Sequence, residues 1–155
     1  MLCTVAYAAA RADDRDLALE AIRDAERAAS LLPEPGGGPR STFRVTPASV
    51  ALYKVGVLWA LGDSGAAVHA GAGIRPGQLP TAERRGRLHT DMARAWWQWG
   101  KPEEAALALL AAHREAPSEV CDRAGIRAIV GSLAERHSRT AGVRELTQLV
   151  GAVDG

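Results

Sequence analysis

Small and apolar residues recur every three or four positions along most of the chain, with charged residues between them. This spacing is the period of one face of an α-helix and differs from the alternation of a half-buried strand. It predicts eight helices, over residues 2–11, 16–32, 47–61, 64–74, 81–99, 101–116, 123–136 and 142–152. Eight helices in 155 residues leave no room for a sheet, so the expected fold class is all-α.

Hydroxyl and carboxylate side chains mark where several of these helices begin. Thr46 precedes Pro47, and Thr81 precedes a run of helix-forming residues, as expected for an N-cap and a first helical turn. Asp16 and Ser64 are the expected N-caps of the helices that they open.

A short turn pattern recurs three times along the chain. In each turn, a residue pair that begins with aspartate or glycine is followed, five positions after its first member, by alanine: Asp13-Asp14 with Ala18, Gly62-Asp63 with Ala67, and Gly100-Lys101 with Ala105. A pattern that recurs at intervals of a few tens of residues is typical of helical repeat proteins. The expected repeat units are 1–32, 47–79 and 81–117, with a flexible loop over 33–46 and capping helices over 123–152.

The third unit carries most signature positions of a tetratricopeptide repeat, which it resembles. The matching residues are Ala93, Trp96, Gly100, Ala105, Leu109, Ala112 and Pro117, whereas His89 stands where that family usually has tryptophan. Small residues at 93 and 105 let two helices approach closely, and Trp96 and Leu109 fill the wider space beside them. The resemblance implies a single domain over 1–155, a stack of about three helical hairpins closed by a C-terminal helix pair.

A second resemblance extends over nearly the whole chain and is clearest in three segments, LYKVGVLWALGDSGAAVHA, LPTAERRGRLHTDMARAWWQWGKPEEAALALLAAHREAPSEV and VRELTQLVG. They resemble the C-terminal region of actinobacterial XRE-family helix-turn-helix transcriptional regulators. The resemblance implies a regulatory module that senses a ligand or partner. No helix-turn-helix unit is recognisable here, so we expect either a piece of a larger regulator or a chain that acts alone.

Composition and charge limit the fold, the classes of partner and the cellular compartment that we expect for this chain. Of the 155 residues 31 are alanine and one is phenylalanine, which favours helices packed closely through small side chains. The net charge of +1 lacks the basic excess of a nucleic-acid binder, so DNA is expected to be reached only through an attached helix-turn-helix domain. Two cysteines give no disulfide framework, which favours the cytoplasm, and no apolar run is long enough for a membrane span.

Binding is expected on the concave surface that, in tetratricopeptide proteins, is lined by the first helix of each pair. The residues that we expect to bind the ligand are Tyr7, Tyr53, Trp59, Arg87, Asp91, Arg94 and Trp97, with Arg11, Thr90 and Gln98 beside them. Aromatic faces beside guanidinium groups suit a peptide, a small polar signal or a protein partner.

The alternative interpretation is that Trp59 and Trp97 are core residues and that the arginines form a solvated helix face. The run WWQW bears on this choice, because its side chains cannot all face one core. The repeat register predicts that Trp96 is buried, which leaves Trp97 or Trp99 to line a groove or an interface.

Signals for enzyme chemistry are weak. The string Gly62-Asp63-Ser64-Gly65 occurs around the nucleophile of trypsin-like proteases, but here it falls at a turn between helices. His69, His89, His113 and His137 lie on different predicted helices, and none has metal-ligand spacing. We expect no enzyme activity, cofactor or metal.

The expected function is therefore a sensor module of a transcriptional regulator, which binds a peptide or small-molecule signal or mediates homodimerisation. A stand-alone protein–protein interaction scaffold is the alternative.

Overall fold

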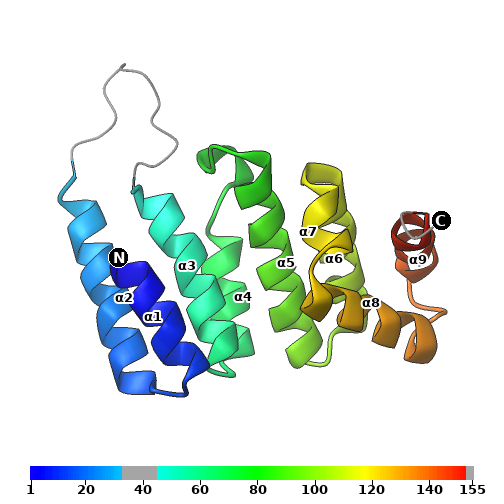
Figure 1. The fold of residues 1–155 in the computed structure, drawn as a ribbon, viewed down its shortest axis with the longest axis horizontal. Coiled ribbons are helices and arrows are strands. Elements are labelled where there is room, and N and C mark those ends of the chain that lie inside the picture. The colour runs from blue at the N-terminus through cyan, green and yellow to red at the C-terminus, as the bar shows by residue number, and fades with distance from the viewer. Residues whose placement is uncertain (33–44, 153–155) are drawn as a thin grey trace. The chain divides into compact units, whose positions relative to one another are not determined.

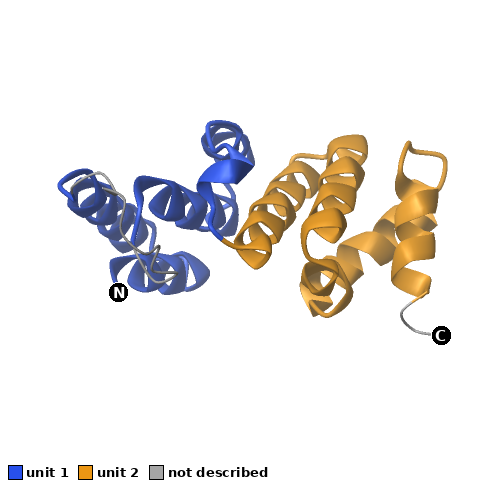
Figure 2. Cartoon of the chain, turned by 90° about the horizontal axis from the view of Figure 1, so that it is seen from above, with its two compact units in different colours: residues 1–80 blue, residues 81–155 orange. Residues whose placement is uncertain are grey.

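The computed structural model describes residues 1–32 and 45–152. Over these residues the chain consists of α-helices and one short 3-10 helix, and it contains no strand (Figure 1). The predicted all-α class is confirmed. The predicted flexible loop at 33–46 lies outside the described residues except for Val45 and Thr46. The chain divides into two compact units, Met1–Pro80 and Thr81–Gly155 (Figure 2).

The first unit consists of two helix pairs. Helices α1 (Leu2–Arg11) and α2 (Arg15–Ser30) form one pair, and α3 (Pro47–Ala60) and α4 (Ser64–Ala72) form the other. Helix α3 packs on both α1 and α2, and the 3-10 helix η1 (Pro76–Gln78) follows α4. The core between the pairs is built mainly from small side chains, and the buried residues are Ala6, Ala9, Ala10, Ala18, Ala21, Ile22, Ala25, Ala29, Val50 and Val57.

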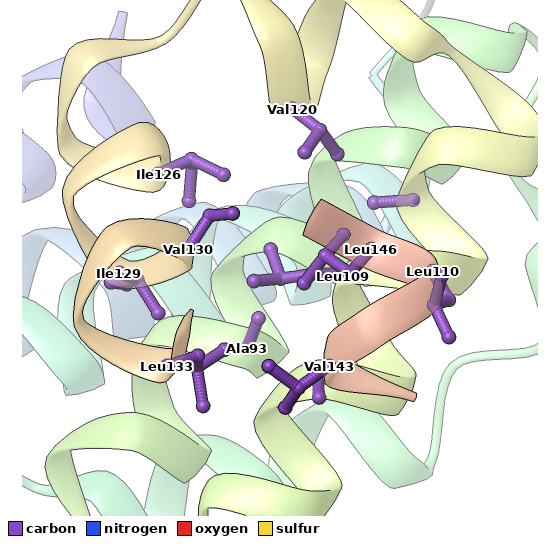
Figure 3. Close-up of a cluster of buried hydrophobic side chains, with 12 residues drawn as sticks. Ala93, Leu109, Leu110, Val120, Ile126, Ile129, Val130, Leu133, Val143 and Leu146 are labelled. Atoms are coloured by element: carbon purple, nitrogen blue, oxygen red, sulfur yellow. The ribbon is translucent and has the colours of Figure 1, made fainter. Parts of the chain in front are cut away.

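The second unit contains the third pair and the C-terminal helices. Helices α5 (Ala82–Gln98) and α6 (Pro102–Glu115) pack together, α8 (Ala124–Arg136) packs on both, and α9 (Val143–Gly151) packs on α6 and α8. The buried residues of this core are Ala93, Ala106, Leu109, Leu110, Ala112, Val120, Ile126, Ile129, Val130, Leu133, Val143 and Leu146 (Figure 3).

A short helix, α7 (Pro117–Cys121), was not expected from the sequence pattern. Pro117 ends the sixth predicted helix as expected, but it is also the first residue of α7. Proline suits a first helical position because the amide hydrogen that it lacks has no partner there. Helix α7 brings Val120 into the core and packs against α5.

Two of the four predicted N-caps are confirmed. The Thr46 hydroxyl accepts a hydrogen bond from the Ser49 amide at 3.1 Å, and the Thr81 hydroxyl accepts one from the Arg84 amide at 3.2 Å. The predictions for Asp16 and Ser64 are wrong. Asp14 caps α2 by accepting from the Leu17 amide, so the helix starts earlier than predicted.

At the start of α4, Asp63 occupies the N-cap position and Ser64 is the first helical residue. The Asp63 side chain makes no capping bond, because its carboxylate pairs with the Arg15 guanidinium at 2.5 Å.

The three turns that share a sequence pattern also share one backbone geometry. Their first residues adopt left-handed backbone conformations, with φ +61° at Asp13, +83° at Gly62 and +76° at Gly100. The next residue in each turn donates its amide to the carbonyl five positions back, at 2.9 Å in all three cases. This hydrogen bond defines a Schellman motif. The alanine that follows, at 18, 67 or 105, is fully buried.

Among the described residues, no helix combines the length and the apolar character required to cross a membrane.

The left-handed turns predict opposite effects for two glycine substitutions. A Cβ at either Gly100 or Gly131 would meet no atom within 4 Å, so only backbone conformation distinguishes the two sites. Gly100→Ala should lower the free energy of unfolding by about 1 kcal/mol, because an L side chain is strained at positive φ. Gly131→Ala, inside α8, should raise it by about 0.5–1 kcal/mol. Urea unfolding measures both, and a change of the same sign in both variants contradicts the turn assignment.

Candidate ligand-binding site

The predicted binding residues fall into two sets, one in each unit. Tyr7 lies on α1, and Tyr53 and Trp59 lie on α3. Tyr7 packs against the core of the first unit, whereas the Tyr53 side chain is exposed. Tyr53 and Trp59 are six positions apart on one helix and therefore point to different sides of it. Within the first unit, these aromatic residues do not form one surface.

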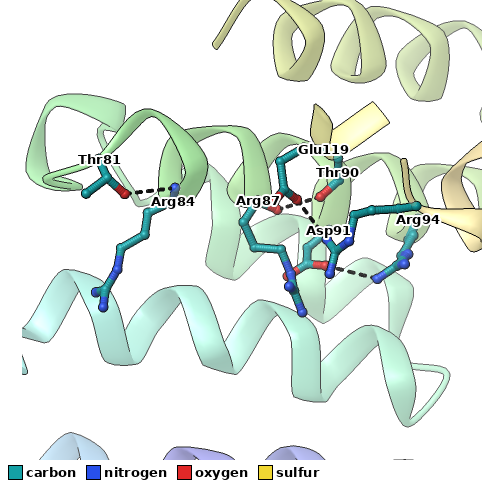
Figure 4. A network of polar contacts seen from close by, with 8 residues as sticks. Thr81, Arg84, Arg87, Thr90, Asp91, Arg94 and Glu119 are labelled. Carbon is teal, nitrogen blue, oxygen red and sulfur yellow. Dashed lines mark hydrogen bonds and ion pairs between the residues drawn. The ribbon is translucent and has the colours of Figure 1, made fainter. Parts of the chain in front are cut away.

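The four predicted residues of the second unit all lie on α5. Arg87, Asp91 and Arg94 occupy positions i, i+4 and i+7, so they share one face of the helix. The Nε atom of Arg87 donates to one oxygen of Asp91 at 3.3 Å, and Nη1 of Arg94 donates to the other at 3.5 Å (Figure 4). One carboxylate thus holds two guanidinium groups.

The three side chains of the Arg87–Asp91–Arg94 network differ sharply in burial. The Asp91 side chain is 4% exposed, that of Arg94 is 16% exposed and that of Arg87 is 34% exposed. The interpretation of the arginines as a solvated helix face is therefore wrong for Arg94. Asp91 is too deeply buried to serve as a broad contact for a ligand, whereas part of Arg87 reaches solvent.

Burial raises the pKa of the Asp91 carboxyl above its ordinary value, because the charged form loses its hydration. The positive charges of Arg87, Arg94 and Arg123 oppose this rise. Burial is the larger of the two opposing effects, so the net direction is a raised pKa. The contacts from Asp91 to Arg87 and Arg94 restrain both guanidinium groups on the same side of α5.

Residues that the sequence analysis missed support the network from α7 and the start of α8. Arg123 donates to Glu119 at 2.9 Å, and Glu119 packs against the backbone of α5 at Gly86. A Cβ at Gly125 would lie 3.3 Å from a terminal nitrogen of Arg94, so a small residue there leaves room for that guanidinium. The i, i+4 spacing of Glu119 and Arg123 is visible in the sequence, but nothing in the pattern places this pair beside α5.

The tryptophan run is arranged differently from the prediction. Trp96 was expected to be buried, but it is half-buried and stacks on the exposed Trp99 with ring centroids 5.6 Å apart. Trp97 is the member that packs against the core, and it is also half-buried. The His137 ring meets Trp97 edge-on at 5.9 Å, and the Arg136 guanidinium lies 5.5 Å from its centroid. Trp97 therefore connects α5 to the end of α8.

The weaker chemical signals fall on structural positions. Gly62 and Asp63 form the turn between α3 and α4, where Arg15 binds the carboxylate. Within the described part of the chain, no three His, Cys, Asp or Glu side chains lie close enough together to hold a metal ion.

The raised pKa of Asp91 predicts how its removal changes stability with pH. The Asp91 carboxyl binds its proton more tightly in the folded chain than in the unfolded chain. The contribution of Asp91 to the free energy of unfolding is therefore greatest below the ordinary pKa of 3.8. This contribution falls as the pH rises through the raised pKa of the folded chain. Asp91→Asn mimics the neutral form of Asp91. Between the ordinary pKa and the raised pKa, its free energy of unfolding should therefore increase relative to that of the natural chain. At higher pH the difference between the two proteins should stay constant.

Urea unfolding of both proteins from about pH 4 to about pH 8 measures the difference. A variant that instead loses relative stability as the pH rises would show that the arginines outweigh burial and lower the pKa of Asp91.

Comparison with known proteins gives no relative: no protein-family model, no curated protein and no solved structure matches the chain.

Proposed function

We propose that the chain is a non-enzymatic regulatory module that binds a peptide or small-molecule signal through the Arg87 face of α5. In this proposal it is the sensor part of a cytoplasmic transcriptional regulator of the XRE type. DNA contact belongs to an attached helix-turn-helix domain, and signal binding shifts the state of that domain.

The observation that carries the proposal is the arrangement around Arg87. Its Nε atom is held by buried Asp91, while its two terminal nitrogens bond to no other described residue. A guanidinium fixed at one end keeps its remaining donors in a constant orientation, which reduces the entropy lost on binding. Such a pair of parallel donors fits a carboxylate or another planar acceptor.

The surroundings favour a charged or polar ligand over an apolar one. Arg84 lies one turn before Arg87 and points to the same side of α5 (Figure 4), and its guanidinium also bonds to no described residue. Asp91 is the carboxylate that faces Arg87 and Arg94, so positive charge exceeds negative charge along this face. An acidic group on the signal would restore the balance.

A stand-alone scaffold that joins two proteins through the same face is the second candidate. Exposed Trp99, which stacks on half-buried Trp96, favours it, because aromatic side chains are enriched in protein interfaces. Homodimerisation is a third use of such a surface, and sedimentation at increasing concentration detects it.

The intact mass of the natural gene product separates the regulator from the scaffold. We expect pull-down from native cells to recover a protein heavier than 16.3 kDa, with peptides from a DNA-binding domain. Recovery at 16.3 kDa alone contradicts the regulator and favours the scaffold.

Ligand capture tests the proposed site independently of the mass. Arg87→Gln leaves a shorter, neutral polar side chain and removes the cation, so we expect it to reduce capture of the native signal by roughly tenfold or more. Arg114→Gln is the matched control, because Arg114 is exposed and has no partner among the described residues. Mass spectrometry of small molecules and peptides that co-purify with each variant gives the measurement.

Equal capture by Arg87→Gln and the natural chain, at unchanged helicity, would exclude this face as the binding site.

A further inference from the structure

The connection between α8 and α9 forms a hollow at the surface of the second unit, far along the chain from Arg87. It has a volume of about 390 Å³ and is lined by Arg136, His137, Ser138, Arg139 and Thr140. A second hollow shares Ser138 and Arg139 and extends along α9 to Arg144, Thr147 and Gln148. No carboxylate lines either hollow.

The charges of this connection are not neutralised by the part of the chain that the structure describes. Arg136, Arg139 and Arg144 form no ion pair with a described residue. Elsewhere in the same unit, by contrast, Arg85 pairs with Glu115 and Arg123 pairs with Glu119. The Ser138 and Thr140 hydroxyls also make no hydrogen bond to a described residue. Two cations and two hydroxyl donors therefore meet in the first hollow without an acceptor.

Helix-end electrostatics accounts for only part of this arrangement. A cation at the C-terminal end of α8 is favoured by the helix dipole, which explains Arg136. Arg139 lies beyond that helix, three residues before the N-cap of α9. No side chain caps the first turn of α9, and Val143 and Arg144 from that turn line the second hollow. The Val143 amide already donates to the Thr140 carbonyl at 3.2 Å, so the start of α9 adds little to the donors of the first hollow.

We propose that this hollow binds the phosphoryl group of a small phosphate compound. Arg136 and Arg139 supply the charged donors, and Ser138 and Thr140 supply hydroxyl donors. A phosphate dianion accepts several such hydrogen bonds at once, and guanidinium groups bind it in a bidentate manner. The site is separate from the Arg87 face and does not depend on the function proposed for that face.

The position of Arg136 provides a direct signal of binding. Its guanidinium lies 5.5 Å from the centroid of the Trp97 ring. A phosphate that draws Arg136 into the hollow removes the cation from this ring, and His137 at the edge of the ring belongs to the same lining. Phosphate binding should therefore change the fluorescence of Trp97.

The test is a titration of the full chain with inorganic phosphate at constant ionic strength, followed by tryptophan fluorescence and calorimetry. We expect saturable binding below about 10 mM, with chloride at matched ionic strength giving no saturable change. Arg139→Ala should weaken binding by roughly tenfold or more, because a charge-assisted pair is lost. Arg114→Ala, an exposed arginine outside the hollow, should leave the dissociation constant within about twofold.

Two further variants distinguish the fluorescence signal from binding itself, and the hollow from the Arg87 face. Trp97→Phe should abolish the phosphate-dependent fluorescence change and keep the calorimetric affinity. Arg87→Gln should not alter phosphate binding, so failure at one site is distinguishable from failure at the other. Circular dichroism confirms that each variant keeps its helices.

An organic monoester distinguishes the two sources of the phosphoryl group. Ribose 5-phosphate binding at least about tenfold more tightly than inorganic phosphate indicates a phosphorylated metabolite, whereas equal affinity indicates free phosphate. No saturable binding of either compound overturns the proposal. Equal weakening by Arg139→Ala and Arg114→Ala also overturns it, because bulk charge then explains the effect.

Discussion

The structure depends on a left-handed turn that closes each of the three long helix pairs. A residue with positive φ ends the first helix, the next amide bonds back across that helix end, and an alanine five positions on enters the contact between the two helices. Since Ala18, Ala67 and Ala105 are fully buried, each turn must place its alanine accurately for the pair to close. Backbone geometry and core packing are therefore specified together at these turns.

Much of the fold follows from local sequence, because the signals involved are short. Helix periodicity, the caps at Thr46 and Thr81, and the turn at Gly100 each depend on residues that lie only a few positions apart in the sequence. The first turn shows where such signals mislead. Asp13 takes the conformation that glycine takes in the other two turns, and this moves the cap to Asp14 in place of Asp16. Aspartate tolerates a positive φ better than most residues, so the first turn keeps the geometry of the other two although it has aspartate where they have glycine.

The candidate site was only partly predictable. Arg87, Asp91 and Arg94 share one face of α5, and this relation can be read from their spacing because it is internal to a helix. The burial of Asp91, and its support from Glu119, Arg123 and Gly125, depends on how α7 and α8 pack against α5. Periodicity carries no information about such tertiary contacts. The same limit explains Trp96, whose stacking on Trp99 is set by the end of the helix and not by the repeat register.

In the proposed site, Asp91 is a positioning residue and Arg87 is the group that it positions. The most direct test is nuclear magnetic relaxation of the arginine side-chain Nε–H groups, which reports their motion on the picosecond-to-nanosecond timescale. We expect the Nε–H of Arg87 to be markedly more rigid than that of Arg114, and Asp91→Asn to remove most of this difference. Arg87 as mobile as Arg114 in the natural chain would contradict the claim that α5 presents a preorganised binding group.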